Sequence, residues 1–449
     1  MSDAPPFPEL LAPAREELAG PLETHARRFP GDSGARQPAH TVYGGAHLFA
    51  RDAARKLGEV ALRALDEHAA SPADLAEAVG LESPDLAAAV HARVRAKLAR
   101  EPVEDFRIDF EDGFGERSDA EEDEAASAAA RETAEGLAAG GLPPFLGIRI
   151  KPLSAELAPR ALRTLGLFIG ELVARTGGAL PPGFVVTLPK VVVAEQVTAL
   201  ARALESLEDG LGLEPGALRL EIMVETPQSI VAPDGSCPLP RFVAAGEGRV
   251  VGAHFGVYDF TAATSITARY QRMRHPVCDL ARQVMLVALS GTGVMLSDGA
   301  TNVLPVPRHR APGGGELDAM RRRENRAAVH AAWRLHYDDV RHSLVNGFYQ
   351  GWDLHPAQLV TRYAALYAFF LESLDAAAER LRHFVERAAR ATLTGDVFDD
   401  AATGQGLLVF FLRGLACGAL TTDEAARAGL APEELATRSF TRILAGRAV

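Results

Sequence analysis

The strongest constraint on the fold is an alternation, over most of the 449 residues, of short apolar runs with longer stretches rich in Ala, Leu, Arg and Glu. The short runs predict buried strands and the longer stretches predict helices, which is the pattern of parallel βα units. Eight strands are predicted, at residues 41–46, 106–110, 145–150, 184–188, 218–224, 250–255, 293–296 and 347–354. Eight consecutive βα units favour an α/β fold closed into a (β/α)8 TIM barrel over an open sheet.

Three regions are predicted along the chain. Residues 1–39 carry seven prolines and predict an N-terminal arm on the surface. Residues 40–358 hold the barrel, with a helical insertion at about 50–103, because the first crossover is twice the length that one helix needs. One helix of the insertion is expected to begin near Ser71. Residues 359–449 predict a C-terminal helical appendage, with an amphipathic stretch at 375–391 and a helix start at Thr421.

Composition excludes several classes of function. The chain has 59 acidic and 47 basic residues and a net charge of −12, which argues against a nucleic-acid binder. No apolar run approaches the roughly 20 residues that span a bilayer, and residues 1–30 do not resemble a signal peptide. The three cysteines, Cys237, Cys278 and Cys417, are far apart and predict reduced thiols. We therefore expect a cytoplasmic protein with no membrane or nucleic-acid partner.

Charged residues follow several predicted strands at their carboxyl ends. The run 218–224 leads into Glu225, and the run 250–255 is followed by Asp259. In a barrel these ends form the mouth, where ligands and metals bind, so the two carboxylates predict a divalent-cation site. Other charged residues follow the second, third and fourth strands: Glu111, Asp112, Arg149, Lys151 and Lys190. Burying so many charges is costly unless they pair or bind a ligand.

Six short motifs follow one another between Arg107 and Gln358. They are Phe110-Glu111-Asp112, Arg149, Pro189-Lys190, Glu225-Thr226, Phe255-Gly256-Val257-Tyr258-Asp259 and His355-Pro356-Ala357-Gln358. In this order they resemble the citrate lyase beta subunit / malyl-CoA lyase / aldolase family of the phosphoenolpyruvate–pyruvate barrel superfamily. The resemblance covers most of the chain.

The resemblance implies a carbon–carbon lyase or synthase that forms a metal-stabilised enolate from a 2-oxo or hydroxy acid. It implies that Glu225 and Asp259 bind Mg²⁺, with Mn²⁺ as an alternative metal. Mg²⁺ prefers hard oxygen ligands and takes only one or two carboxylates, which agrees with this pair. It further implies catalytic or substrate-binding roles for other residues of the motifs: Glu111, Asp112, Arg149, Lys190, Pro227 and His355. Arg149 would hold the oxyanion.

The chain departs from the family pattern in its first strand, where the family carries Arg-Ser and Pro-Gly. Here the segment reads Thr41-Val42-Tyr43-Gly44-Gly45, and since that region often helps to bind coenzyme A, the use of a thioester stays open. A second resemblance lies in the appendage, where residues 398–403 are similar to a segment of malate synthase. That resemblance implies that Asp400 is the catalytic base.

Simpler readings of the same residues stay open. Glu225 and Asp259 could cap helices, Arg149 could pair with Glu111 or Asp112, and Lys190 could form an ion pair instead of contacting substrate. His254 on an apolar strand is expected to be a core histidine, and the arginines at 308–326 are expected to form a solvated face. The enzymatic alternative to a lyase is thioester hydrolysis or phosphoenolpyruvate chemistry. A non-catalytic metabolite-binding scaffold is the third hypothesis, and the Ala/Leu-rich tail predicts a homo-oligomer.

Overall fold

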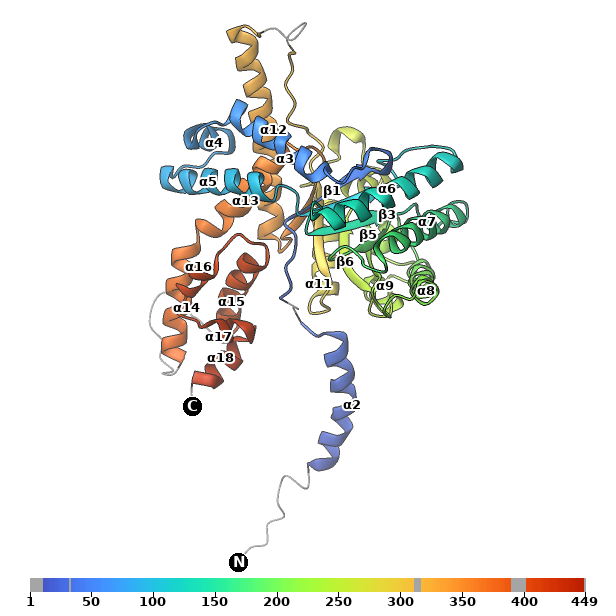
Figure 1. The fold of residues 1–449 in the computed structure, drawn as a ribbon. Coiled ribbons are helices and arrows are strands. Elements are labelled where there is room, and N and C mark those ends of the chain that lie inside the picture. The colour runs from blue at the N-terminus through green and yellow to red at the C-terminus, as the bar shows by residue number, and fades with distance from the viewer. Residues whose placement is uncertain (1–10, 32–33, 311–315, 389–400, 448–449) are drawn as a thin grey trace, which may run out of the picture.

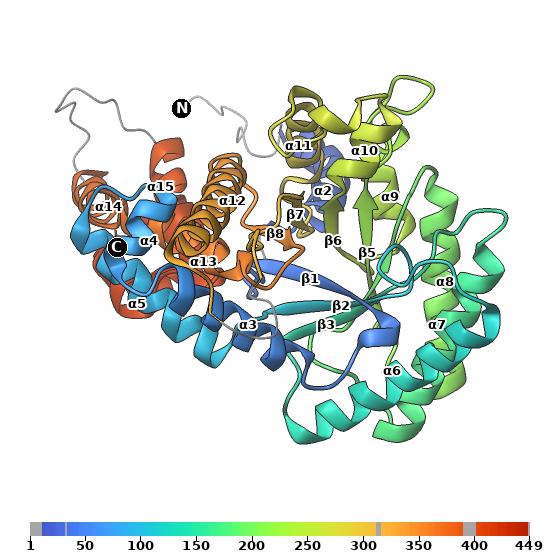
Figure 2. The same ribbon diagram turned by 90° about the horizontal axis from the view of Figure 1, so that it is seen from above.

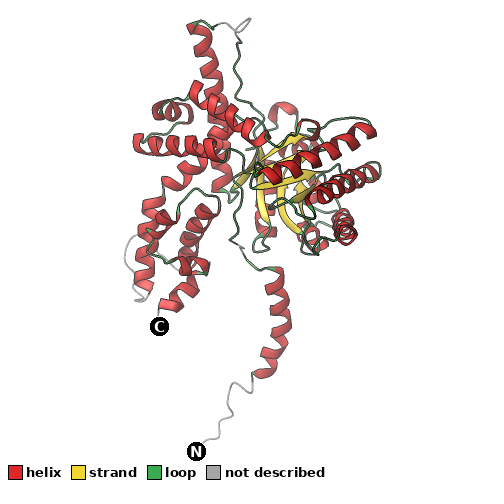
Figure 3. Ribbon diagram, in the orientation of Figure 1, coloured by secondary structure: helices red, strands yellow, loops and turns green. Residues whose placement is uncertain are grey.

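The computed structural model describes residues 11–31, 34–310, 316–388 and 401–447. Eight parallel strands form a closed barrel in which each strand pairs with the next and β8 pairs with β1. The strands lie at the centre and helices surround them (Figure 3). Their bounds are β1 His40–Gly45, β2 Asp105–Asp109, β3 Phe145–Arg149, β4 Val185–Leu188, β5 Arg219–Val224, β6 Val250–Phe255, β7 Met295–Ala300 and β8 Gln350–Asp353.

Helices α6 (Asp119–Ala139), α7 (Ala158–Thr176) and α8 (Ala194–Leu211) wrap one side of the barrel (Figures 1 and 2). The other side is covered by α3–α5 together with α12 and the helices that follow it. The remaining bounds are α3 Ala53–His68, α4 Pro72–Val79, α5 Pro84–Arg100, α9 Leu239–Ala245, α10 Val257–Ala263, α11 Pro276–Leu289, α12 Ala319–Val345 and α13 Gln358–Leu371. Three 3₁₀ turns, η1 Ala46–Leu48, η2 Pro227–Ser229 and η3 Ala268–Tyr270, complete the barrel domain.

The predicted (β/α)8 barrel with an N-terminal arm, a helical insertion and a helical appendage is confirmed. The insertion holds the three helices α3, α4 and α5. Helix α4 begins at Ser71, whose hydroxyl accepts from the Asp74 backbone N–H while the Asp74 carboxylate accepts from the Ser71 N–H. This reciprocal pair satisfies two backbone donors that the first turn of a helix leaves free, and so it fixes the start of α4.

Between strands and helices the core is apolar and rich in aromatic rings. The Phe168 ring of α7 lies 6.3 Å from that of Phe110 and stacks on Phe184 at 6.0 Å. All three side chains are buried. The inside of the barrel is different, since β2, β3 and β5 turn charged side chains inward. The fold therefore gathers a set of buried charges in the compartment that opens at the carboxyl ends of the strands, while other buried pairs, such as Arg282 with Asp298, join helices to the barrel.

The appendage consists of α14 Leu374–Ala388, α15 Ala401–Ala416, α16 Thr422–Ala426, α17 Pro432–Ala436 and α18 Phe440–Arg447. It packs beside the barrel, against α13 and α5 (Figure 2). The Arg413 guanidinium lies 3.3 Å from the Gln37 side-chain oxygen and 5.4 Å from the centre of the Tyr349 ring. Gln37 and Tyr349 stand just before β1 and β8, so α15 contacts the barrel domain on the side away from the mouth.

The predicted arm contains a helix that the sequence analysis did not foresee. Helix α2 (Ala12–Arg28) extends away from the barrel and buries none of its residues (Figure 1). The prolines predicted an arm on the surface; within the helix Pro13 stands in the first turn, where proline is favoured, and Pro21 lies inside. Among the described helices none is long and apolar enough to cross a membrane. Cys237, Cys278 and Cys417 are all free thiols.

Candidate active site at the barrel mouth

Seven charged side chains meet at the carboxyl ends of β2 to β6, and we call them the mouth cluster. They are Asp109, Glu111, Asp112, Arg149, Lys190, Glu225 and Asp259. Asp109 ends β2 and Arg149 ends β3, while Glu225 follows β5 directly. Asp259 lies in the first turn of α10. Five strands thus converge on one set of charges because parallel strands in a barrel all end at the same face.

Arg149 is held rigidly in this cluster. Its Nε and Nη2 donate to the two Asp109 carboxylate oxygens at 2.7 and 2.5 Å. The Tyr43 and Trp352 rings lie 4.8 and 5.5 Å from the guanidinium carbon. Burial would lower the pKa of Arg149, but the hydrogen bonds and charge of Asp109 outweigh it and raise that pKa. Arg149 is therefore a permanent cation in a fixed orientation, whose Nη1 lies 3.1 Å from Glu111 and 3.8 Å from Asp112.

Lys190 joins two sides of the cluster. Its ammonium pairs with Glu111 and lies 3.5 Å from Asp259. Its backbone has a φ of 52°, which is uncommon for a residue with a side chain, and its N–H donates to Glu225 at 2.8 Å. Burial would lower the pKa of Lys190, but the charges of Glu225 and Glu111 raise it. The unusual backbone conformation thus lets one residue contact Glu225 through its main chain and Glu111 through its side chain.

Glu225 and Asp259 form the acidic part of the cluster. Glu225 is 1% exposed, whereas the Asp259 side chain is 42% exposed. Burial, and then the charge of Asp259, raise the pKa of Glu225 to about 8. A Cβ on Gly256, at the end of β6, would lie 2.4 Å from a Glu225 oxygen, so Gly256 provides the room for this carboxylate.

The residues present fit a divalent cation. In the part of the chain that the structure describes, the cations that pair with carboxylates of the mouth cluster are Arg149 and Lys190. A buried carboxylate beside a second one is stabilised by a bound cation. Within the described residues no group of three or more His, Cys, Asp or Glu side chains could hold a metal. A two-carboxylate set suits Mg²⁺, which keeps several positions for water and substrate oxygens.

A family model described as "Domain of unknown function (DUF6986)" matches residues 21–443, which is nearly the whole chain. The chain belongs to the DUF6986 family. No curated protein matches the sequence of this DUF6986 chain.

Solved structures resemble the DUF6986 chain in fold. A citrate lyase from Burkholderia xenovorans LB400 is 18% identical, with 88% of this chain and 97% of that chain covered and a TM-score of 0.57. A lead(II) complex of Haloferax volcanii malate synthase is 15% identical, with 93% and 98% covered and a TM-score of 0.46. Protein CitE from Mycobacterium tuberculosis, in complex with magnesium and acetoacetate, is 18% identical, with 74% and 91% covered and a TM-score of 0.38.

Deeper in the barrel, the DUF6986 chain carries a second group of charges, which we call the inner cluster: Asp105, Arg107, Glu221 and His254. Arg107 donates to Glu221 at 2.6 and 2.9 Å and pairs with Asp105. His254 bonds Glu221 through Nε2 at 2.9 Å and faces the Tyr43 hydroxyl through Nδ1 at 3.5 Å. All four side chains are buried. The prediction that His254 is a satisfied core histidine agrees with these contacts.

His355 and Pro227 of the DUF6986 chain stand apart from the mouth cluster. His355 lines a pocket of about 310 Å³ between β1 and α3, among Val42, Leu48, Phe49 and Leu57. Its Nδ1 accepts from the Ala357 N–H at 3.2 Å, and burial lowers its pKa. Pro227 begins η2 behind Glu225. Six of the predicted site residues thus lie together in the mouth cluster: Glu111, Asp112, Arg149, Lys190, Glu225 and Asp259. His355 lies outside this cluster, in a largely apolar pocket.

Asp400 lies outside the described residues. Sequence reasoning missed Asp109, Tyr43 and Trp352, which hold Arg149 in place. The alternation of side chains along a strand could have predicted the place of Asp109. Residues 105, 107 and 109 of one strand face the same side, here the inside of the barrel. No comparable signal in the sequence of the DUF6986 chain joins Tyr43 and Trp352 to Arg149, since these contacts depend on closing β8 onto β1.

Proposed function

We propose that the chain is a Mg²⁺-dependent carbon–carbon lyase or synthase that acts on a 2-oxo or hydroxy acid through an enolate. The observation that carries the proposal is the pair of carboxylates, Glu225 and Asp259, beside the fixed guanidinium of Arg149. The fold likeness to a citrate lyase supports it. Because one barrel fold hosts many reactions, the site and not the fold decides the chemistry.

Glu225 and Asp259 would hold the metal. When bound, Mg²⁺ or Mn²⁺ supplies a Lewis acid that polarises the keto oxygen of the substrate. The elevated pKa of Glu225 supports this assignment, because a cation beside it would favour the ionised carboxylate and resolve its repulsion with Asp259.

Arg149 would bind the negative oxygen of the substrate and of the enolate. Asp109 already occupies its Nε and Nη2, so Nη1 is the donor that faces the mouth. A donor that is held before the reaction begins stabilises developing charge without reorganisation. Glu111 and Asp112 form ion pairs with this side of Arg149 and with Lys190, and the hydrogen bond from Lys190 would keep Glu111 in place as substrate enters.

Asp109, Glu111 and Asp112 pair with Arg149 or Lys190, and Glu225 and Asp259 would hold the metal, so we propose a separate base for a donor's methyl group. The resemblance of residues 398–403 to malate synthase implies Asp400 for this role, whereas α15, which begins at the next residue, belongs to the appendage and lies away from the mouth. Exchanging Asp400 for Asn tests it: solvent deuterium exchange of the substrate's methyl protons should be lost, while binding of the 2-oxo acid should persist.

Calorimetric titration of oxaloacetate, pyruvate and glyoxylate, with Mg²⁺ or with EDTA, tests the proposed function. Wild type should bind at least one acid only with Mg²⁺, and Asp259→Asn should abolish that binding. Asp209→Asn, at an exposed position of α8, is the matched control and should behave as wild type. Adding acetyl-CoA to the responsive acid then tests thioester use.

Two outcomes would contradict the lyase. Binding that ignores both metal and Asp259 would remove the metal site on which the proposal depends. Metal-dependent binding without turnover of any donor would favour the metabolite-binding scaffold.

A further inference from the structure

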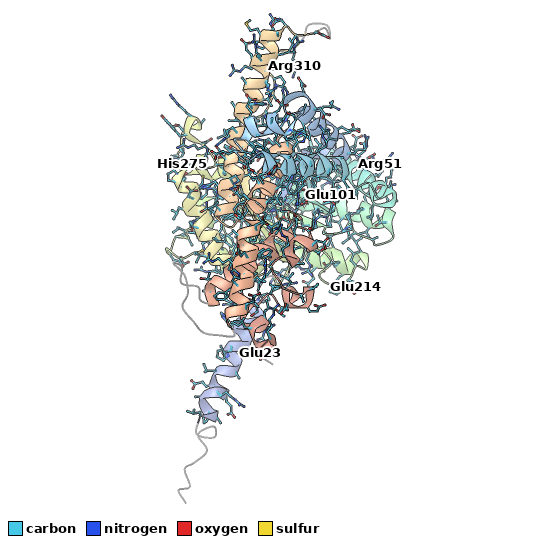
Figure 4. All side chains as sticks on the ribbon, turned by 90° about the vertical axis from the view of Figure 1, so that its left-hand side faces the viewer. Glu23, Arg51, Glu101, Glu214, His275 and Arg310 are labelled. Atoms are coloured by element: carbon cyan, nitrogen blue, oxygen red, sulfur yellow. The ribbon has the colours of Figure 1, made fainter. Side chains whose placement is uncertain are left out.

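A cleft lies between the insertion helix α5 and the appendage, on the side of the barrel away from the mouth. Its volume is about 600 Å³, which is within the range of pockets that bind small molecules. Glu101, directly after α5, lines the cleft where the insertion meets the appendage (Figure 4). Arg36 and Glu104, which stand shortly before β1 and β2, also line it. The residues of the mouth cluster are all described, and none of them lines this cleft.

The lining of the cleft carries an excess of positive charge. Its charged residues are four cations and two carboxylates, an excess of two in a chain of net charge −12: Arg36, Lys97, Arg100, Arg438, Glu101 and Glu104. The Lys97 ammonium lies 2.5 Å from both carboxylates. Arg36 also pairs with Glu101 and lies 3.2 Å from Glu104. The two carboxylates are thus neutralised within the lining, whereas Arg100 forms no ion pair among the described residues.

The wall on the appendage side is apolar. Leu412 and Leu415 of α15 and Leu435 of α17 line it, and all three side chains are half-buried. A ligand that covered them would gain about 25 cal/mol for each Å² of apolar surface removed from water. One basic wall and one apolar wall together suit a molecule that has an anionic end and an apolar body.

Tyr367 of α13 supplies a hydrogen-bond donor to the same cleft. The residue is only 7% exposed, and its hydroxyl has no hydrogen-bond partner among the described residues. Burial, and then the charge of Glu104, raise the pKa of Tyr367, so this hydroxyl stays protonated and can donate. Leaving a nearly buried donor without an acceptor costs free energy, which an oxygen of a ligand would recover.

We infer that this cleft binds an amphipathic anion, a molecule with an apolar or aromatic body and a phosphate or carboxylate end. Arg100 and the Tyr367 hydroxyl would donate to the anionic oxygens, since hydrogen bonds to charged oxygens are stronger than those between neutral groups. Leu412, Leu415 and Leu435 would cover the body. Such a ligand contacts both the insertion and the appendage, so it would hold these two parts together. This inference does not depend on the proposed function.

Calorimetric titration of the full chain with ADP and, separately, with decanoate tests the inference, and the two probes distinguish a nucleotide from an acyl anion. EDTA is present throughout, so that a metal at the mouth cannot bind the phosphates. Wild type should bind one of the probes at one site per chain. Arg100→Gln should weaken this binding about tenfold and Tyr367→Phe about fivefold, because each removes one donor to a charged oxygen. Arg95→Gln, on α5 but outside the cleft, is the matched control and should bind as wild type does.

Hydrogen exchange locates the bound probe and shows whether the variants are folded. Without probe, the exchange pattern of both variants should match that of wild type, since Arg100 is exposed and phenylalanine fills the space of the Tyr367 ring. With probe, the amides near Arg100 in α5 and near Leu412 in α15 should exchange more slowly. Protection confined to the mouth would overturn the inference. Binding that neither substitution weakens, or the failure of both probes to bind, would also overturn it.

Discussion

The inner cluster and the mouth cluster both bury charged side chains in one barrel, yet they are built differently. In the inner cluster Arg107 lies between two carboxylates, and His254 contacts one of them, while Thr41 donates to Asp105 at 2.8 Å. In the mouth cluster five carboxylates face two cations. The inner cluster has one arginine for two carboxylates, with a hydrogen-bonded histidine beside them, whereas the mouth cluster has two cations for five carboxylates and so carries more unpaired carboxylates.

This difference separates residues that hold the barrel together from residues available for chemistry. The pKa of Glu221 in the inner cluster is lowered well below its usual value, because Arg107 and His254 together outweigh the effect of burial. The pKa of Glu225 at the mouth is raised, because burial and Asp259 outweigh Lys190 and Arg149. The pKa values of two glutamates four residues apart, Glu221 in β5 and Glu225 directly after it, thus shift in opposite directions.

Arg107→Met should have the largest effect on stability. It leaves Asp105 and Glu221 buried without their cation, and breaking a buried pair in this way costs about 3–5 kcal/mol. Urea denaturation measures the loss. Arg163→Met, at an exposed position of α7, should change stability by less than about 1 kcal/mol. An equal effect of both substitutions would show that Arg107 contributes no more to stability than an exposed ion pair does.

Arg149→Lys should mainly reduce turnover. Lys keeps the charge but cannot reproduce the two parallel bonds to Asp109, so we expect a loss of about 10²- to 10³-fold in kcat, by analogy with loss of one oxyanion donor. Steady-state kinetics on the acid identified by calorimetry measures it. Unchanged kcat would show that Arg149 belongs with the inner cluster as a structural residue.

Glu225→Gln should remove the response to Mg²⁺ and stabilise the metal-free protein near pH 8. The neutral amide avoids the burial cost and the repulsion by Asp259, which we expect to be worth about 1–3 kcal/mol. Thermal denaturation with EDTA and with Mg²⁺ measures both effects. Glu221→Gln is the matched control, and it should destabilise the protein, since it weakens the bonds to Arg107 and His254.

Stability without metal should fall as pH rises from about 4.5 to about 8. The folded-state pKa of Glu225 lies above its usual value of 4.5, so in this window the folded protein binds more protons than the unfolded chain. Its stabilisation is complete below pH 4.5 and is lost as pH rises through 8. Glu221 has the opposite sign, since its contribution is lost as pH falls below 4.5. Saturating Mg²⁺ should remove the fall in the free energy of unfolding between pH 4.5 and 8, and should leave the loss below pH 4.5 unchanged. Urea denaturation at a series of pH values tests this.

Gly256→Ala should have the smallest effect, a loss of about tenfold in Mg²⁺ affinity. The new Cβ would lie 2.4 Å from a Glu225 oxygen and would displace that carboxylate, whose supporting contacts tune metal affinity. Isothermal titration with Mg²⁺ measures it. Gly166→Ala, in α7 with open space around it, should leave affinity unchanged and slightly stabilise the helix.

The sequence predicted all eight strands because strand-like and helical segments alternate, and closure of the barrel then brought distant carboxylates to one face. It could not predict that Asp109, rather than Glu111 or Asp112, makes the closest pair with Arg149. Loop residues after a strand have no fixed side, and the Glu111–Asp112 turn directs both away from the Arg149 Nε. The positive φ of Lys190 could not be predicted from the sequence either, because it depends on how the strand ends pack together.

Helix α2 shows a second limit of structure prediction from the sequence. Its prolines concealed a helix because proline at the first turn is compatible with helix formation, and its exposed leucines, Leu18 and Leu22, give no local sign of a surface that packs against them. The spacing of apolar residues along a helix predicts which of its faces is apolar. It does not predict which surface packs against that face.

The seating of the appendage against Gln37 and Tyr349 has a practical consequence for handling the protein. Helix α18 ends on the same side of the body as α2, away from the strand ends that carry Arg149 and Glu225. A capture tag after residue 449 would therefore immobilise the chain on a sensor surface with its substrate entrance facing the flowing solution. Such a format would allow candidate acids to be screened on one coated chip.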